Sequence, residues 1–222
     1  MAGSKTRGRG GGRVSRSKSS ARWLARQRRD PYTRKAAAEG RVSRAHFKLE
    51  EIDRRCRLLR PGMRVLELGA APGGWTRYVE ERIRGGMLVA CDFRAISAGP
   101  DTQVVEGAVG DPDVDAEIAR LLDDQPVELV LSDMSPNISG IRTVDQALSM
   151  ELAELAENCA DRWLKPGGRL VIKIFQGEGV EAWIPKLRKK YDKVRLLKPK
   201  ASRSDSREVY VVAEGFRRSR AG

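Results

Sequence analysis

The stretch Glu67-Leu68-Gly69-Ala70-Ala71-Pro72-Gly73-Gly74-Trp75 decides the fold of this chain. It lies between a short apolar run, 64–68, and a helical pattern over 75–83, so it predicts a turn from a strand into a helix. Glycines there let the backbone approach a ligand, and the start of a helix offers free N–H groups to an anion. Because the spacing departs from that of a dinucleotide fingerprint, we expect a smaller carboxylate rather than a pyrophosphate.

A second residue strengthens the ligand interpretation of this turn. Asp92 follows Gly73 by nineteen residues and closes the next strand-like run, where an acid commonly accepts hydrogen bonds from a ribose. A nucleoside that carries an amino-acid carboxylate satisfies both features, and S-adenosylmethionine is such a molecule. The alternative, a tight turn without a ligand, explains the glycines but not the acid.

Strand-like and helix-like segments alternate along most of the chain. The expected strands are 64–68, 87–91, 103–105, 127–131, 169–175, 193–197 and 208–212, and the expected helices lie near 75–83, 114–122, 144–163 and 180–191. An earlier apolar stripe, from Ala45 to Leu59 after a candidate N-cap at Ser43, predicts one more amphipathic helix. This alternation predicts an α/β fold with a mostly parallel sheet and helices on both faces. The last two strands have no helix between them, so they should form a hairpin with one antiparallel strand.

Charge is distributed unevenly over the 222 residues, whose net charge is +13. Residues 1–60 carry +14, residues 61–185 carry −10 and residues 186–222 carry +9. This division predicts a ligand-binding or catalytic body with polyanion-binding surfaces from both ends. Two alternatives are that the basic ends only aid solubility, or that the polyanion is a membrane surface, which would require an amphipathic helix that residues 1–20 lack.

Several other classes of protein are excluded by composition. The cysteines Cys56, Cys91 and Cys159 form no CxxC pair, and His46 is the sole histidine, so we expect neither a structural zinc site nor a disulfide framework. No apolar run approaches the ~20 residues that span a bilayer, and the first thirty residues lack a secretory core. We therefore expect a cytoplasmic protein with no bound metal and no membrane contact.

Isolated charges stand where burial makes them costly. Lys173 interrupts the apolar run 170–175, which reads as a central strand, and an unpaired ammonium there would be expensive. Asp133 ends another strand-like run, at the edge where open α/β sheets bind ligands. Each residue taken singly has another explanation. Lys173 could extend its ammonium to solvent from an outer strand, and Asp133 could cap the loop or the next helix.

Five motifs in order, between about residues 22 and 213, make the chain similar to the FtsJ-type large-subunit ribosomal RNA ribose methyltransferases. They are Ser43-Arg44-Ala45-His46-Phe47-Lys48-Leu49, Gly69–Trp75, Ser132–Asn137, Lys173-Ile174-Phe175-Gln176-Gly177-Glu178-Gly179 and Ser206-Arg207-Glu208-Val209-Tyr210. The resemblance implies a Rossmann-like, seven-stranded fold that uses S-adenosylmethionine. It also implies a catalytic tetrad and a set of cofactor contacts. The tetrad is Lys48, Asp133, Lys173 and Glu208, and the cofactor contacts are Gly69, Gly73, Gly74, Trp75, Asp92 and Asp133.

The activity that the resemblance implies is methyl transfer to the ribose 2′-hydroxyl of a uridine in 23S ribosomal RNA, on the large ribosomal subunit. Lys173 is the candidate base, and Lys48 and Glu208 would orient the hydroxyl. Alternative functions are methylation of transfer RNA or of a messenger RNA cap, or ribosome assembly without catalysis. An assembly factor would not need Lys173 inside an apolar strand.

The chain departs from the family at two positions. Ala108 stands where the family usually has an acid that contacts adenine, so either Asp111 replaces that acid or the backbone and packing hold the base. His46 stands where the family often has Trp, and we interpret it as an aromatic substitute.

We expect four segments and a monomer. They are a disordered basic tail (1–20), a basic RNA-binding segment with a helix on the core (21–60), the catalytic domain (61–215) and a basic C-terminal tail (216–222). RNA contacts should come from 22–35, Arg41, Arg44, Arg54, Arg55 and 186–207.

Overall fold

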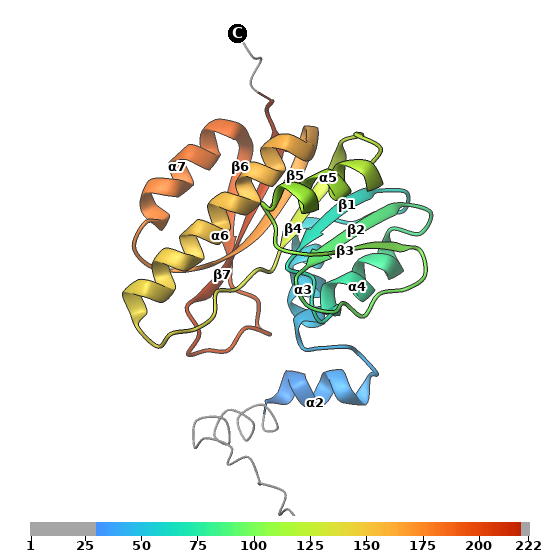
Figure 1. Ribbon diagram of the computed structural model, residues 1–222. Coiled ribbons are helices and arrows are strands. Elements are labelled where there is room, and N and C mark those ends of the chain that lie inside the picture. Colours follow the sequence, from blue (N-terminus) through green and yellow to red (C-terminus); the bar gives the residue numbers. More distant parts are fainter. Residues whose placement is uncertain (1–29, 219–222) are drawn as a thin grey trace, which may run out of the picture.

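A computed structural model of the chain describes residues 30–218 (Figure 1). The expected tail 1–20, residues 22–29 of the stretch expected to contact RNA, and the last four residues lie outside the described part. The helices are α2 (Pro31–Ala38), α3 (Ala45–Cys56), α4 (Gly74–Arg82), α5 (Pro112–Leu121), α6 (Arg142–Trp163) and α7 (Val180–Lys190). The strands are β1 (Arg64–Leu68), β2 (Met87–Asp92), β3 (Thr102–Glu106), β4 (Val127–Ser132), β5 (Leu164–Phe175), β6 (Tyr191–Leu197) and β7 (Glu208–Phe216). None of these helices is long and apolar enough to cross a membrane.

The strands form one seven-stranded sheet in the order β3-β2-β1-β4-β5-β7-β6. Strands β1 to β5 pair in parallel, whereas β7 is antiparallel to both β5 and β6. The predicted fold class, with its hairpin and single antiparallel strand, is therefore confirmed. Because β7 runs in the opposite direction, its first residue, Glu208, pairs with Phe175 at the end of β5.

Helices cover both faces of the sheet, which explains why its central strands are apolar on both sides. One core cluster packs side chains of α5, α6 and α7 against the sheet, and a second packs side chains of α3 and α4 against the opposite face. Figure 1 shows these two layers, with α2 set below α3 at the edge of the molecule. A small third cluster joins Ala36 of α2, Phe47 of α3 and Ala201 of the loop between β6 and β7.

Three local features differ from the expectations. Helix α3 begins at Ala45 rather than directly after Ser43, although Ser43 Oγ accepts a hydrogen bond from Ala45 N at 3.3 Å. Strand β5 begins at Leu164, and its register against β4 shifts between Val127 and Leu129. Helix α2 was not expected at all.

The start of helix α2 has a clear physical cause. Asp30 Oδ1 accepts a hydrogen bond from Thr33 N at 2.9 Å, which caps the free end of the helix. Pro31 occupies the first turn, where its fixed φ fits and its missing N–H costs nothing. The dipeptide Asp30-Pro31 is therefore the sequence signal for this helix.

Helix α3 is fastened to the core by one buried carboxylate. Asp53 Oδ1 accepts hydrogen bonds from the backbone N–H groups of Leu58 and Leu59, at 2.8 and 2.9 Å. Asp53 Oδ2 accepts a third from the hydroxyl of Tyr78, at 3.0 Å, and Tyr78 belongs to α4. This carboxylate therefore fixes both the end of α3 and its position against α4.

We predict that Asp53→Ala lowers the free energy of unfolding by about 2 to 4 kcal/mol, because it leaves two backbone N–H groups and a hydroxyl without their acceptor. Urea unfolding followed by circular dichroism measures the change. Glu154→Ala, at an exposed carboxylate within helix α6, is the control. Equal small losses for the two variants would contradict the anchoring role.

Candidate active site

A cavity opens where β1, β2 and β4 end. Its lining comes from the ends of these strands, from the loop after β3 and from α6: Gly69, Asp92, Phe93, Arg94, Gly107, Ala108, Val109, Met134, Ser135, Leu152 and Leu155. Most of these side chains are apolar, whereas Asp92 contributes a carboxylate at the end of β2. The cavity therefore lies at the carboxyl edge of the parallel strands, the expected place for a ligand in such a sheet.

Glycine is required at position 69, where β1 turns into the loop. The residue has φ +72°, and a Cβ there would lie 2.7 Å from the backbone nitrogen of Met134. The loop after β4 can pack this closely on the turn only because the side chain is absent. Gly69 therefore shapes one wall of the cavity.

Asp92 is buried at the rim of the same cavity. Its Oδ2 accepts a hydrogen bond from Ala71 N at 3.0 Å, and its Oδ1 accepts one from Arg94 N at 2.9 Å. The carboxylate thus ties the glycine-rich turn to the end of β2, and the side chain of Arg94 also donates to both of its oxygens, at 3.3 and 3.5 Å.

Four further residues were expected to contact a cofactor; Asp133 is absent from the cavity lining, and the other three pack elsewhere. Gly73, with φ +105°, lies against the backbone of Ser97, and Gly74 lies against the side chain of Ser43. The indole nitrogen of Trp75 donates to Ala45 O at 2.9 Å. In the described part of the chain these residues do not belong to the cavity lining, so their contact with a cofactor stays a prediction.

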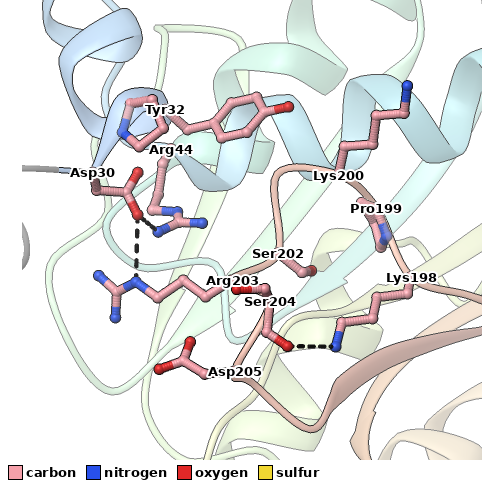
Figure 2. Close-up of a pocket in the computed structure, with 11 residues that line it drawn as sticks. Asp30, Tyr32, Arg44, Lys198, Pro199, Lys200, Ser202, Arg203, Ser204 and Asp205 are labelled. Atoms are coloured by element: carbon pink, nitrogen blue, oxygen red, sulfur yellow. Dashed lines mark hydrogen bonds and ion pairs between the residues drawn. The ribbon is translucent and has the colours of Figure 1, made fainter.

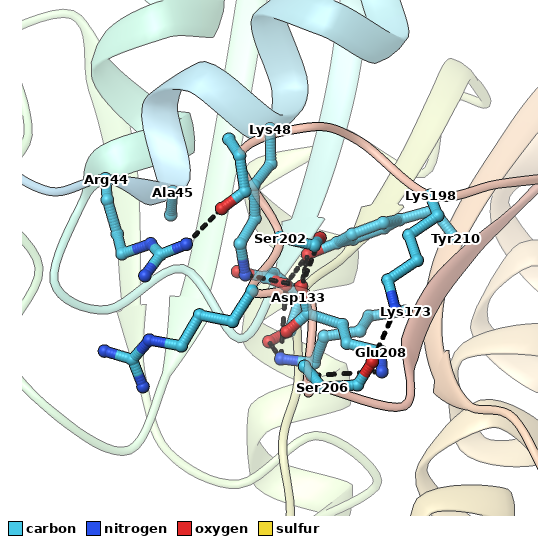
Figure 3. A network of polar contacts seen from close by, with 12 residues as sticks. Arg44, Ala45, Lys48, Asp133, Lys173, Lys198, Ser202, Ser206, Glu208 and Tyr210 are labelled. Carbon is cyan, nitrogen blue, oxygen red and sulfur yellow. Dashed lines mark hydrogen bonds and ion pairs between the residues drawn. The ribbon is translucent and has the colours of Figure 1, made fainter. Parts of the chain in front are cut away.

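The structure brings the four charged residues of the expected tetrad together (Figure 3). Lys48 Nζ, from α3, lies 2.6 Å from Glu208 Oε1. Lys173 Nζ, from β5, lies 3.2 Å from Asp133 Oδ1 and donates to the backbone oxygen of Asp133 at 2.6 Å. Residues from α3, from the end of β4, from β5 and from β7 thus form two neighbouring ion pairs.

Tyr210 joins the two ion pairs, and the sequence reasoning did not identify it. Its hydroxyl lies 2.9 Å from Asp133 Oδ1 and 3.2 Å from Glu208 Oε1. A phenol carries one proton, so it donates to one carboxylate at a time. On β7 Tyr210 pairs directly with Lys173 of β5, and its position two residues after Glu208, on the same face of the strand, was the available signal.

Ser202 adds a further donor to Glu208 from the loop between β6 and β7. Its hydroxyl donates to Glu208 Oε1 at 2.9 Å. Nothing in the local sequence marks this serine, because the contact depends on how the loop folds back.

The protonation states of two members follow from their surroundings. Burial raises the pKa of Glu208, but the nearby Lys48 and Lys173 outweigh it and hold this pKa below the ordinary value, so the carboxylate stays ionised. Burial, together with Asp133 and Glu208, raises the pKa of Tyr210 well above its ordinary value. Tyr210 therefore remains a hydrogen-bond donor at neutral pH.

The two departures from the family pattern are resolved by packing. Ala108 lines the cavity, whereas Asp111 caps α5 by accepting from Asp113 N at 2.9 Å. Of the two alternatives for holding the adenine, this arrangement favours backbone and apolar contacts over a contact with Asp111. His46 is buried edge-on between Phe47 and Tyr78, at centroid distances of 5.4 and 5.0 Å, and burial lowers its pKa, as expected of a neutral aromatic substitute.

The sheet order and the crevice at its carboxyl edge define a Rossmann-like methyltransferase. The crystal structure of a ribosomal RNA methyltransferase from Plasmodium falciparum aligns with a TM-score of 0.71 and 25% identity, covering 78% of this chain and 97% of that chain. The family model described as FtsJ-like methyltransferase matches residues 41–216. The chain belongs to this family.

Two bacterial relatives of similar length have the same name. The protein named ribosomal RNA large subunit methyltransferase E of Pseudomonas aeruginosa is 47% identical over 206 residues, which covers 92% of this chain and 99% of the relative. The protein of the same name from Xanthomonas oryzae pv. oryzae is 50% identical over 204 residues, covering 91% of this chain and 97% of the relative.

One more carboxylate is buried beside the site. Glu67, in β1, is 1% exposed, and neither carboxylate oxygen has a hydrogen-bond partner among the described residues. Burial raises its pKa to about 8. The group is therefore mostly protonated at neutral pH in the folded protein, whereas in the unfolded chain it titrates near 4.5.

We predict that Glu67→Gln raises the melting temperature at pH 8 and reduces its dependence on pH. A folded-state pKa above the unfolded value contributes stability that is complete below pH ~4.5 and is lost as the pH rises toward about 8. Glutamine cannot ionise, so the variant escapes this loss. Thermal unfolding over this pH range measures the effect, with Glu154→Gln as an exposed control. Parallel pH profiles for Glu67→Gln and the parent would refute the prediction.

Proposed function

We propose that this protein transfers a methyl group from S-adenosylmethionine to the ribose 2′-hydroxyl of a uridine in 23S ribosomal RNA of the large subunit. The observation that carries the proposal is the buried network of Lys48, Asp133, Lys173 and Glu208 beside the glycine-lined cavity. The names of the bacterial relatives support ribosomal RNA of the large subunit as the substrate.

The cavity, of about 170 Å³, has the chemistry expected for the adenosine part of the proposed cofactor. Gly69 lets the loop after β4 pack against the turn and so shapes one wall, and Asp92 offers a carboxylate at the end of β2. Phe93, Leu152 and Leu155 form apolar walls for a base. Gly73, Gly74 and Trp75 would act less directly, by holding the turn. When bound, S-adenosylmethionine supplies a methyl group already activated by its sulfonium.

The network matches the demands of a hydroxyl nucleophile. A ribose hydroxyl both donates and accepts hydrogen bonds, so a lysine paired with a carboxylate can hold it in one orientation. Lys48 and Glu208 form such a pair, with Ser202 and Tyr210 fixing the carboxylate. We assign orientation of the 2′-hydroxyl to this pair.

Lys173 is placed to take up the proton of the hydroxyl. Once its ammonium has released a proton to solvent, its amine would accept the proton of the hydroxyl as the oxygen replaces the sulfur on the methyl carbon. The ammonium that forms again would be stabilised by Asp133 through the backbone oxygen at 2.6 Å and Oδ1 at 3.2 Å. The same aspartate begins the loop that carries Met134 and Ser135 into the cavity. Asp133 thus links the proton acceptor to the cofactor site.

The substrate is tested by incubating the protein with tritiated S-adenosylmethionine and one of four acceptors: large ribosomal subunits that lack the modification, free 23S ribosomal RNA, transfer RNA or capped messenger RNA. Nuclease digestion and chromatography then identify the methylated nucleotide. We expect 2′-O-methyluridine in the subunits. Methylation of transfer RNA or of a cap alone would favour the alternative enzymes, and methylation of none would favour an assembly factor.

We predict that Lys173→Ala lowers kcat for methyl transfer by at least about a hundredfold, because the proton acceptor is lost, while affinity for S-adenosylmethionine changes little. Single-turnover transfer and isothermal calorimetry measure the two quantities. Lys165→Ala, at the opposite end of β5, is the matched control and should retain activity. Equal loss of affinity and turnover in Lys173→Ala would mark Lys173 as structural.

A second prediction concerns Tyr210. Tyr210→Phe removes a hydrogen bond that favours ionised Glu208, so the pKa of Glu208 rises and the acidic limb of the kcat profile moves to higher pH. Tyr191→Phe is the control, because the buried hydroxyl of Tyr191 has no partner among the described residues. An unchanged profile for Tyr210→Phe would limit its hydroxyl to a structural role.

A further inference from the structure

A second cleft, of about 900 Å³, opens between α2 and the loop that joins β6 to β7 (Figure 2). Its lining comes from three parts of the chain and includes Asp30, Tyr32, Arg44, Lys200, Ser202 and Arg203. Its size lies within the range of binding sites for small organic molecules. Neither the network nor the cofactor cavity described above requires this cleft.

The cleft adjoins the charged network. Ser202 lines it and also donates to Glu208 Oε1 at 2.9 Å. Arg44 lines it one helical turn before Lys48. An RNA chain whose reacting ribose lies at the network would therefore place its neighbouring nucleotide in this cleft.

The walls of the cleft are held together by specific contacts. Arg44 donates to Asp30 and to the backbone oxygen of Ala201. Arg203 Nε lies 3.4 Å from Asp30 Oδ2, which joins the loop to the start of α2. The backbone of Lys200 donates to Glu51 Oε2 of α3 at 2.6 Å. The loop is thereby fixed against both N-terminal helices.

The cleft combines an aromatic ring with exposed positive charge. The ring of Tyr32 packs against Phe47 at a centroid distance of 5.8 Å, and the residue, half-buried, also lines the cleft. Lys198 and Lys200 are exposed and belong to the loop between β6 and β7 (Figure 2), where Lys198 Nζ donates to the backbone oxygen of Ser206 at 2.7 Å. An aromatic face offers stacking to any base, and a lysine offers a point charge to a phosphate.

We propose that this cleft binds the nucleotide next to the methylated ribose, with its base stacked on Tyr32 and its phosphate held by Lys200. The proposal rests on the proposed function for its RNA ligand. It requires an unpaired nucleotide, because a base inside a duplex cannot expose its face to a side chain.

The test separates the base from the phosphate. Fluorescence anisotropy measures binding of a labelled oligouridylate of about twelve nucleotides and of an abasic oligomer with the same number of phosphates. We expect Tyr32→Ala to weaken oligouridylate binding roughly tenfold and to leave abasic binding unchanged. Tyr32→Phe keeps the ring and should bind within about twofold of the parent.

The contribution of the Lys200 ammonium is measured separately, through the salt dependence of oligomer binding. Lys200→Gln should weaken binding of both oligomers equally and lower the slope of log affinity against log salt by about one. Arg84→Gln removes an exposed charge in the turn between α4 and β2, at the end of the parallel strands far from the network. This variant should leave the slope unchanged. Equal slopes for Lys200→Gln and the parent would overturn the assignment of the phosphate to Lys200.

Two outcomes would overturn the stacking assignment: an unchanged oligouridylate affinity in Tyr32→Ala, or an equal loss on both oligomers, which would mean a site for polyanions without bases. Methyl transfer by the parent to large subunits is measured in parallel. If the parent methylates them while Tyr32→Ala binds normally, only this inference fails. If it methylates none yet Tyr32→Ala discriminates the oligomers, the subsite stands and the proposed function fails.

Discussion

The mutual neutralisation of two lysines and two carboxylates, whose side chains are between 7% and 17% exposed, is the constraint on which the rest of this structure depends. Each charge alone would be costly at this depth, and removing one member leaves its partner uncompensated. The pairs Lys48–Glu208 and Lys173–Asp133, joined by the hydroxyl of Tyr210, avoid that cost only if α3, β4, β5 and β7 converge. The antiparallel direction of β7 is what allows this, because it brings the start of one strand to the edge where the parallel strands end.

The same elements carry the network and the cleft beside it. Helix α3 supplies Lys48 to the network and Arg44 to the cleft, and the loop between β6 and β7 supplies Ser202 to both. Contacts of this loop with α2 and α3 therefore help to position Glu208, because Ser202 of the loop donates to its carboxylate. In an enzyme that must align an oxygen with a methyl group, such sharing lets substrate binding order the reacting groups.

Much of the fold could be predicted from local patterns, because each strand and most helices have their own periodicity. Lys173 could be identified because few purely structural roles explain a lysine in an apolar strand. Tyr210 did not, because a tyrosine in a buried strand looks like ordinary core, and only the position of Asp133 gives its hydroxyl a role. Helix α2 was missed although Asp30-Pro31 marks its start, since its single buried residue, Ala36, makes no visible stripe. The packing of Gly73 and Gly74 depends on distant loops that local sequence does not encode.

Counting basic residues overestimates the surface available to RNA. Several cations expected to bind it are already paired: Arg44 with Asp30 where both are largely buried, and Arg41 with Glu81 and Arg55 with Glu51 nearer the surface, where a pair is worth little. A half-buried arginine that neutralises an acid of its own chain gains little from a phosphate, because the acid would lose its partner. Lys198 Nζ donates to the backbone oxygen of Ser206 at 2.7 Å, whereas the exposed Lys200 can exchange counterions for phosphates. The arginines thus build the cleft, and Lys200 gives it an affinity that depends on salt.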